Sequence, residues 1–173
     1  MAAKEILLLG NPLLRQRCRN VRAPRSEESR QVITDLRDTL AEFRSHRGFG
    51  RGIAAPQIGT SQKIIYISSD FTGAMINPAI VRKSRMRFRL WDDCFSFPDL
   101  LAYVQRNYSV VVSFTDEEGK HRQLHAKGAF AELLQHEIDH LNGILAIDRA
   151  IDSRHIILRS EFEKLSHAGP AVL

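Results

Sequence analysis

The chain has 173 residues, 43% of them hydrophobic and 26% charged, which is an ordinary composition for one globular domain. A net charge of +5 permits contact with a polyanion but does not indicate specific DNA binding. The amino-terminal apolar run is only four residues long, and no stretch is long enough to span a membrane. The two cysteines, Cys18 and Cys94, do not suggest a disulfide framework. We therefore expect a single cytoplasmic domain over residues 1–173, without a membrane partner.

The first predicted element is a helix over residues 26–46. Ser26 can cap its start, and glutamates follow in the first turn. Apolar residues recur at helical spacing along it and predict a core-facing stripe: Val32, Ile33, Leu36, Leu40 and Phe43.

A glycine-rich stretch follows the helix, at residues 48–59. Gly50 and Gly52 keep side chains away from the backbone, so that a ligand or another chain can approach closely. Gln57 is the neutral amide of this stretch and is able to donate to an oxyanion. Taken alone, the pattern fits a plain loop at least as well as a binding site.

Alternating apolar and polar residues predict several strands after this stretch. They are expected at residues 63–68, at a short segment ending at 78, and at 80–91, 101–106, 108–114 and 120–126, with a hairpin turn at 115–119. In the strand over 80–91, Arg85, Arg87 and Arg89 form one face. The favoured interpretation is a sheet edge protected by charge, and the alternative is a contact with RNA or an acidic partner.

The next helix is predicted to begin at Gly128 and to end near Leu141. It carries His136 and His140 four residues apart, so both imidazoles lie on one helix face and are able to bind one metal ion. Glu137 is placed to reach a water molecule on that metal. This H-E-x-x-H pattern lacks a third ligand. A thiolate from the loop containing Cys94 is a natural candidate.

A last helix is predicted over residues 154–167, capped by Ser153, and residues 168–173 are expected to fray. Together these elements indicate an α+β fold in which mostly antiparallel strands surround a central metal-binding helix.

Three segments carry a resemblance to a known family. They are Gly50-Arg51-Gly52-Ile53-Ala54-Ala55-Pro56-Gln57, Asp92-Asp93-Cys94-Phe95-Ser96 and Gln135-His136-Glu137-Ile138-Asp139-His140. In this order they resemble the G-x-G-x-A-A-P-Q, E-G-C-L-S and Q-H-E-x-D-H motifs of the peptide deformylases. The first and third match fully, and lesser matches extend the resemblance over most of the chain.

The resemblance implies a metal-dependent hydrolase that removes the formyl group from N-formyl-methionyl peptides and releases formate. It implies Fe²⁺ bound by Cys94, His136 and His140, with Zn²⁺, Ni²⁺ or Co²⁺ able to substitute. Glu137 would be the base, while the Gln57 amide and the Phe95 backbone N–H would stabilise the oxyanion. Association with the ribosome is a further family expectation, with which the basic residues of the last helix are compatible.

The resemblance also places the peptide in a groove beside the glycine-rich stretch. The residues expected to line this groove are Gly50, Arg51, Gly52, Asp93 and Leu133. Asp93 stands where the family has glycine, and Arg51 stands at a position that is often Ile or Val. We expect an Arg51–Asp93 pair across the groove mouth to be able to change substrate preference. Asp92 replaces a glutamate of the family and is expected to pair with Arg106.

Three other interpretations stay open at this point. A gluzincin-type peptidase would use Glu161 or Glu163 as the third ligand, which would leave Cys94 without a role. A deformylase-like paralogue would act on a different N-formyl or N-acyl compound. A non-catalytic module would keep the fold and use its arginine-rich strand to bind RNA.

Overall fold

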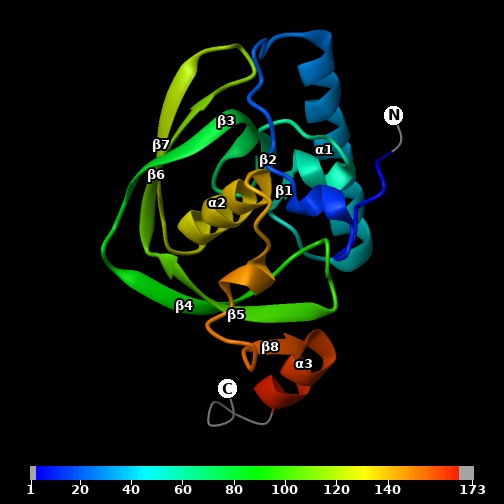
Figure 1. Ribbon diagram of the computed structural model, residues 1–173, viewed down its shortest axis with the longest axis vertical. Helices are drawn as coiled ribbons and strands as arrows, with labels where there is room; N and C mark the ends of the chain where they lie inside the picture. Colours follow the sequence, from blue (N-terminus) through cyan, green and yellow to red (C-terminus); the bar gives the residue numbers. More distant parts are fainter. Residues whose placement is uncertain (1–2, 168–173) are drawn as a thin grey trace.

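The computed structural model describes residues 3–167, and it consists of two antiparallel sheets around one helix (Figure 1). The larger sheet has the order β1-β2-β3-β6-β7 and the smaller one the order β4-β5-β8. The strands of the two sheets are β1 (Gly52–Ala54), β2 (Ile64–Ser68), β3 (Thr72–Lys83), β4 (Arg87–Asp93), β5 (Leu100–Asn107), β6 (Ser109–Thr115), β7 (His121–Lys127) and β8 (Ile156–Leu158). The α-helices of the protein are α1 (Glu27–Arg47), α2 (Gly128–Leu141) and α3 (Arg159–His167). The predicted α+β fold with antiparallel strands around the histidine-bearing helix is confirmed.

Helix α1 forms as the sequence predicts. The Ser26 side chain accepts a hydrogen bond from the Ser29 backbone N–H, and the helix ends at Gly48, which is in the left-handed region at φ 76°. Its stripe packs on the outer side of the larger sheet: Leu36 and Leu40 join a buried cluster that includes Ile53 of β1. This packing holds β1, and with it the glycine-rich stretch, against the rest of the molecule.

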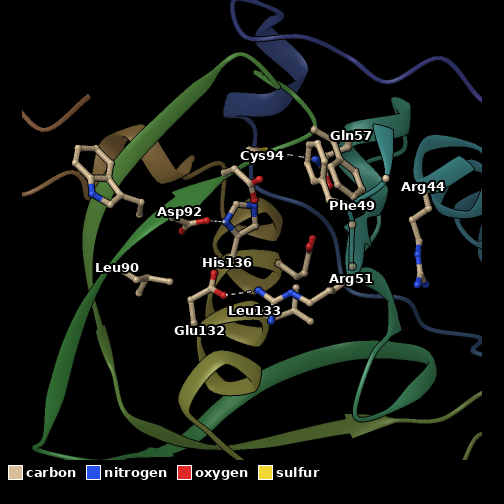
Figure 2. A pocket seen from close by; sticks show the side chains of 17 residues that line it. Arg44, Phe49, Arg51, Gln57, Leu90, Asp92, Cys94, Glu132, Leu133 and His136 are labelled. Carbon is tan, nitrogen blue, oxygen red and sulfur yellow. Dashed lines mark hydrogen bonds and ion pairs between the residues drawn. The ribbon is translucent and has the colours of Figure 1, made fainter. Parts of the chain in front are cut away.

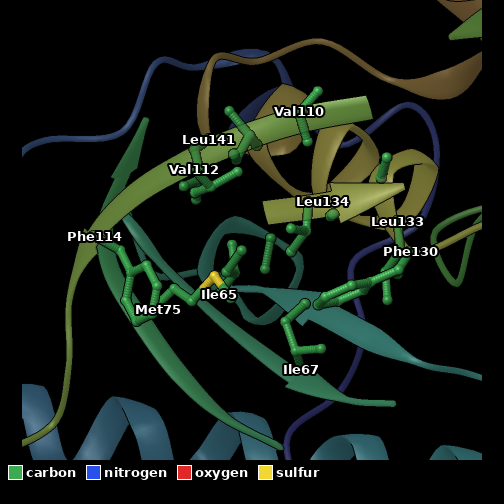
Figure 3. Packing of buried hydrophobic residues seen from close by; sticks show 14 of the residues in the cluster. Ile65, Ile67, Met75, Val110, Val112, Phe114, Phe130, Leu133, Leu134 and Leu141 are labelled. Atoms are coloured by element: carbon green, nitrogen blue, oxygen red, sulfur yellow. The ribbon is translucent and has the colours of Figure 1, made fainter. Parts of the chain in front are cut away.

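Helix α2 is enclosed by the strands, and every residue from Phe130 to Leu141 is buried. Leu134 is fully buried in the cluster that contains Ile65 of β2, Met75 of β3 and Val112 of β6 (Figure 3). Helix α2 therefore carries its histidines and its glutamates in the interior of the protein, where polar groups require partners. Among the described residues, no helix combines the length and the apolar character needed to cross a membrane.

The prediction of a single strand over residues 80–91 is wrong, because the chain leaves one sheet and enters the other within it. Strand β3 ends at Lys83 and β4 begins at Arg87. The Ser84 hydroxyl donates to the Met86 carbonyl and accepts from the Ser109 N–H, so local hydrogen bonds replace the ladder at this turn. The alternation itself is correct within β4, where Arg87 and Arg89 are exposed.

The prediction of a helix from 154 to 167 is correct only in its second half. Asp152 accepts hydrogen bonds from the Arg154 N–H and the His155 ring, which makes a turn there in place of a cap at Ser153. Residues 156–158 then pair with β5 as strand β8, and helix α3 begins at Arg159. The tail predicted to fray, 168–173, lies outside the described residues.

The end of α2 is fixed by a close backbone contact at Gly143. This residue is in the left-handed region at φ 73°, and an added Cβ would lie 2.4 Å from the Arg15 carbonyl oxygen. Gly48 at the end of α1 has a similar φ of 76° but nothing within 4 Å of an added Cβ. We expect Gly48→Ala to lower the free energy of unfolding by ~1 kcal/mol from backbone strain alone.

Gly143→Ala adds the collision with Arg15 and is expected to lower the free energy of unfolding by ~3 kcal/mol. Urea unfolding of both variants checks this difference. Equal losses would show that the amino-terminal segment moves away from α2 at little cost.

Candidate active site

Two histidines of α2 and one cysteine beyond β4 bring their ligand atoms together. The Cys94 Sγ lies 3.2 Å from His140 Nε2, which in turn lies 3.2 Å from His136 Nε2. All three side chains are buried, and their ligand atoms lie within 4.8 Å of one another. The spacing of four residues places both imidazoles on the same helix face, as predicted, and the chain after β4 brings the thiol to them. Figure 2 shows Cys94 and His136 at the active-site pocket.

This donor set fits a metal ion. A tetrahedral ion with bonds of ~2.0–2.3 Å to sulfur and nitrogen holds its ligand atoms roughly 3.3–3.8 Å apart, close to the spacings found here. Burial also favours such an ion, because the Cys94 sulfur and the two Nε2 atoms face one another in the interior, where a bound cation would be a common partner for all three. One thiol and two imidazoles leave a fourth position for a water molecule or a substrate.

A line of buried charged side chains begins at the Nδ1 atom of His136. Its Nδ1 lies 2.9 Å from an Asp92 carboxylate oxygen, and the other Asp92 oxygen accepts a 3.0 Å hydrogen bond from Arg106. Arg106 also donates to Asp139, which accepts from Arg149. The predicted Asp92–Arg106 pair is therefore confirmed. Because this line of charges orients the imidazole, it positions a ligand atom toward the metal site.

The pKa values in this interior follow from burial and from the same charges. Burial raises the pKa of Asp92, but His136 and Arg106 outweigh it and bring this pKa down to about 2. Burial disfavours the charged form of His136, yet Asp92 raises its pKa well above the usual 6.5. At His140, burial and the neighbouring His136 lower the pKa well below 6.5, so this imidazole is neutral and has a lone pair to offer.

Glu137 lies beside the three ligand side chains, and one of its carboxylate oxygens has no hydrogen bond within the described residues. The side chain is buried, and its Oε2 has no hydrogen-bond partner among the described residues. Burial raises the pKa of Glu137 to about 7. An added Cβ on Gly52 would lie 2.8 Å from the other oxygen, Oε1, so this glycine of β1 is required for the carboxylate to fit. Glu137 is thus able to exchange a proton near neutral pH.

Gln57 directs its amide nitrogen toward the same point. It lies on a short 3₁₀ helix, Ala55–Ile58, that follows β1. Its Oε1 accepts from the Ala54 N–H at 2.9 Å, which orients Nε2 toward the Cys94 sulfur at 3.6 Å and the Ser96 hydroxyl at 3.3 Å. The backbone N–H of Phe95 has no acceptor within the described part of the chain. Two N–H donors, one from Gln57 and one from Phe95, therefore lie close to the Cys94 ligand atom.

A cavity of about 430 Å³ opens onto this site. The predicted groove residues all line it: Gly50, Arg51, Gly52, Asp93 and Leu133. Gln57, Cys94, Phe95, His136 and Glu137 line it as well, so the cavity joins the predicted groove to the predicted catalytic groups.

The predicted Arg51–Asp93 pair does not form, because each residue has another partner. Arg51 donates to Glu132 on α2 at 2.8 Å and to the Ala129 carbonyl at 3.1 Å (Figure 2). Asp93 accepts a 2.7 Å hydrogen bond from Arg159 at the start of α3. Sequence reasoning missed Glu132, although its position four residues before His136 places it on the metal-binding face of the helix.

The structure does not support a glutamate of α3 as the third ligand. Cys94 completes the group with His136 and His140, whereas Glu161 lies on α3 in an exposed ion pair with Lys164. The gluzincin interpretation therefore does not hold.

The fold and the site together define a metal-dependent hydrolase, and comparison with known proteins specifies which kind. A sequence profile of the polypeptide deformylase family matches residues 3–155. A peptide deformylase of Thermomicrobium roseum is 39% identical over 162 residues, which is 88% of each chain, and one of Brucella suis is 33% identical over 172 residues, covering 96% of this chain and 95% of the other.

Solved structures agree with the sequence comparisons. The peptide deformylase of Synechococcus elongatus in complex with actinonin has a TM-score of 0.82 at 32% identity, and the two chains match over 99% of this one and 89% of that one. The enzyme of Legionella pneumophila has a TM-score of 0.80 at 30% identity, over 98% and 100%. The chain belongs to the peptide deformylase family and removes the formyl group from nascent peptides.

The buried ion pairs of Arg106 with Asp92 and Asp139 allow a test of how much they stabilise the fold around the site. Arg106→Met leaves Asp92 and Asp139 without their shared buried cation, so we expect the free energy of unfolding to fall by ~3–5 kcal/mol. The matched control is Arg122→Met, which breaks the more exposed pair with Asp116 and should cost ~0–1 kcal/mol. Urea unfolding measures both. A loss as small as that of the control would mean that Asp92 and Asp139 find other partners.

Proposed function

We propose that Cys94, His136 and His140 bind the catalytic metal ion and that Glu137 is the general base of deformylation. The observation that supports this most directly is the meeting of three buried ligand atoms beside a carboxylate oxygen without a protein partner. Such a donor set suits Fe²⁺, Zn²⁺, Ni²⁺ and Co²⁺. We propose Fe²⁺ as the ion used in the cell, in line with the family resemblance. When bound, the metal supplies Lewis acidity and lowers the pKa of a water molecule to ~7.

In this proposal Glu137 moves the proton of the reaction. It accepts a proton from the water molecule whose oxygen attacks the formyl carbon. It then passes that proton to the nitrogen of the peptide as the C–N bond breaks, so formate and a free amino terminus result.

Gln57 and Phe95 stabilise the charge that develops on the formyl oxygen. The Gln57 amide nitrogen is oriented by its own Oε1 hydrogen bond, and the Phe95 N–H has no other acceptor in the described chain. Donors that are held in place before the reaction require no reorganisation in the transition state. A formyl group carries no side chain, so it fits between these donors and Glu137.

The peptide is proposed to lie along β1. This strand is the terminal strand of the larger sheet, and within residues 3–167 it pairs only with β2. An extended peptide is able to add to such an edge through main-chain hydrogen bonds. Gly50, Arg51 and Gly52 border this edge, while Asp93 and Leu133 line the cavity beside it.

The surroundings of the enzyme are proposed from its chemistry. Cys94 is a free cysteine, and its role as a ligand requires that it stay reduced, which favours the cytoplasm. Because the substrates are nascent peptides, we also propose an association with the ribosome. The basic residues of the carboxy-terminal segment offer limited support, since Arg154 pairs with Asp152, Arg159 with Asp93 and Lys164 with Glu161. A contact between the arginines of β4 and RNA stays an untested alternative.

Formate release tests the proposed function. The protein loaded anaerobically with Fe²⁺ is expected to release formate from short N-formyl peptides. Glu137→Gln keeps the shape of the side chain but removes the base, so we expect kcat to fall ~10²–10⁴-fold while the metal content stays unchanged. A coupled formate assay and elemental analysis measure the two quantities. A variant as fast as the wild type would contradict the role of Glu137, and a metal-loaded wild type without formate release would contradict the function.

Metal content tests Cys94 separately from activity. Cys94→Ser replaces a soft thiolate by a hydroxyl group, and we expect Fe²⁺ or Zn²⁺ to be lost during gel filtration. The matched control is Cys18→Ser, which alters a cysteine buried in a hydrophobic cluster and should keep the metal. Full metal occupancy in Cys94→Ser would exclude Cys94 as a ligand.

A further inference from the structure

A second cavity, of about 450 Å³, is separate from the active site. Among the described residues, it shares no lining residue with the active-site cavity. Both sheets border it, through the end of β3 and through parts of β4 and β5, and Gln135 and Asp139 of α2 line it as well. The chain passes from β3 to β4 at the outer side of the molecule (Figure 1). The volume of this second cavity is in the range of cavities that bind small ligands.

Positive charge dominates the lining of the second cavity. Its charged residues are five cations and one carboxylate: Arg82, Lys83, Arg87, Arg106, Arg149 and Asp139. Two of these cations are already compensated, because Arg106 pairs with Asp92 and Asp139, and Arg149 pairs with Asp139. Two cations and two carboxylates thus balance one another, and three cations are left.

The three remaining cations have no partner in the described part of the chain. Arg82, Lys83 and Arg87 are exposed, and none of their side chains forms an ion pair or a hydrogen bond within residues 3–167. Arg149 also has a donor to spare, since it binds Asp139 through Nε and Nη2 and its Nη1 has no acceptor within the same residues. The second cavity therefore combines an excess of positive charge with N–H donors that the protein does not use.

Protection of a sheet edge does not account for this arrangement. Strand β4 is the terminal strand of the smaller sheet, and an exposed charge such as that of Arg89 prevents such an edge from pairing with another chain. Arg82 and Lys83, however, belong to β3 in the other sheet. They share the second cavity with Arg106, which is only 4% exposed. Cations from several elements around one concave site indicate a binding site for an anion.

We propose that the second cavity binds a small ligand that carries a chain of two or three phosphate groups, such as a nucleoside triphosphate. Arg82, Lys83 and Arg87 bind the phosphate oxygens from the exposed rim, and the Nη1 of Arg149 binds them beside α2. Guanidinium groups suit this chemistry because their N–H groups bind phosphate oxygens in pairs.

The charge and the shape of the second cavity select this class of ligand. A single carboxylate would compensate only one of the three unpaired cations, whereas a chain of phosphates carries several negative charges. A concave site also favours a small ligand over a flat anionic surface. The inference goes beyond the proposed function, because none of the proposed metal ligands or catalytic groups lines this cavity.

Titration of the metal-loaded protein with inorganic tripolyphosphate tests the site. We expect one equivalent to bind with a Kd of ~10 μM or below in ~50 mM salt, and more weakly as the salt concentration rises, because the attraction is electrostatic. The triple variant Arg82→Gln/Lys83→Gln/Arg87→Gln is expected to bind at least ~10-fold more weakly. Calorimetry measures the affinity, and elemental analysis afterwards checks that tripolyphosphate has not removed the metal. A wild type that does not bind overturns the inference.

A matched control separates the cavity from net charge. Arg17→Gln/Arg22→Gln/Arg30→Gln removes three exposed cations of the amino-terminal segment and α1, and it should keep the wild-type affinity. Tripolyphosphate should also raise the melting temperature of the wild type and of this control, but not that of the first triple variant. An equal loss of affinity in both triple variants overturns the inference. Formate release is expected to stay at the wild-type rate in both, so the proposed function is tested separately.

Competition separates a small polyphosphate from other sources of phosphate. ATP is expected to displace tripolyphosphate from the same site. A single-stranded RNA of ~12 nucleotides and vesicles that contain phosphatidylglycerol are expected to compete less well at the same phosphate concentration. Stronger competition by the RNA or by the vesicles would overturn the assignment of a small ligand.

Discussion

The site depends on placing charged and polar groups of one helix inside a hydrophobic enclosure. Helix α2 buries His136, Glu137, Asp139 and His140 among the strands, where each uncompensated charge would be costly. The compensation comes from Arg106 on β5, which binds Asp92 and Asp139 at once. The smaller sheet thus supplies the cation, and the larger sheet and α1 supply the packing. The hydrophobic enclosure also affects the chemistry of the site, because burial raises the pKa of Glu137 toward neutrality.

The sequence predicts the parts of this arrangement that depend on local spacing. The i, i+4 histidines and the capped helix α1 follow from helix geometry. The glycine-rich stretch predicted a close approach to its backbone, but not that Glu137 is the group that approaches Gly52. The pairing of Asp92 with Arg106 came from family resemblance and not from periodicity. The predicted positions of most strands along the chain were right, but the boundary between β3 and β4 was missed. Hydrophobic alternation continues through this turn, which Ser84 stabilises by its own hydrogen bonds.

The sequence could not specify which charges pair inside the groove. Arg51 and Asp93 were both expected there, and both line the cavity. Their partners are Glu132 and Arg159, which are 81 and 66 residues away in the chain. Such pairings depend on tertiary distances that periodicity does not encode. Glu132 offered a signal in its position one turn before His136, whereas Arg159 offered none, because residues 156–158 were assigned to a helix and not to the strand that carries the chain to the groove.

Arg159 shows that the partner of the groove residue Asp93 comes from a segment beyond the part that matches the family profile. The match ends at residue 155, and β8 and α3 follow. Strand β8 pairs with β5, which brings Arg159 to Asp93, to the Pro98 carbonyl and over the ring of Phe49 at 4.6 Å. Asp93 therefore directs its charge toward α3 and not across the groove toward Arg51. The negative charge that stands where the family has a glycine is thus neutralised by Arg159 of α3, while Arg51 is neutralised by Glu132 of α2.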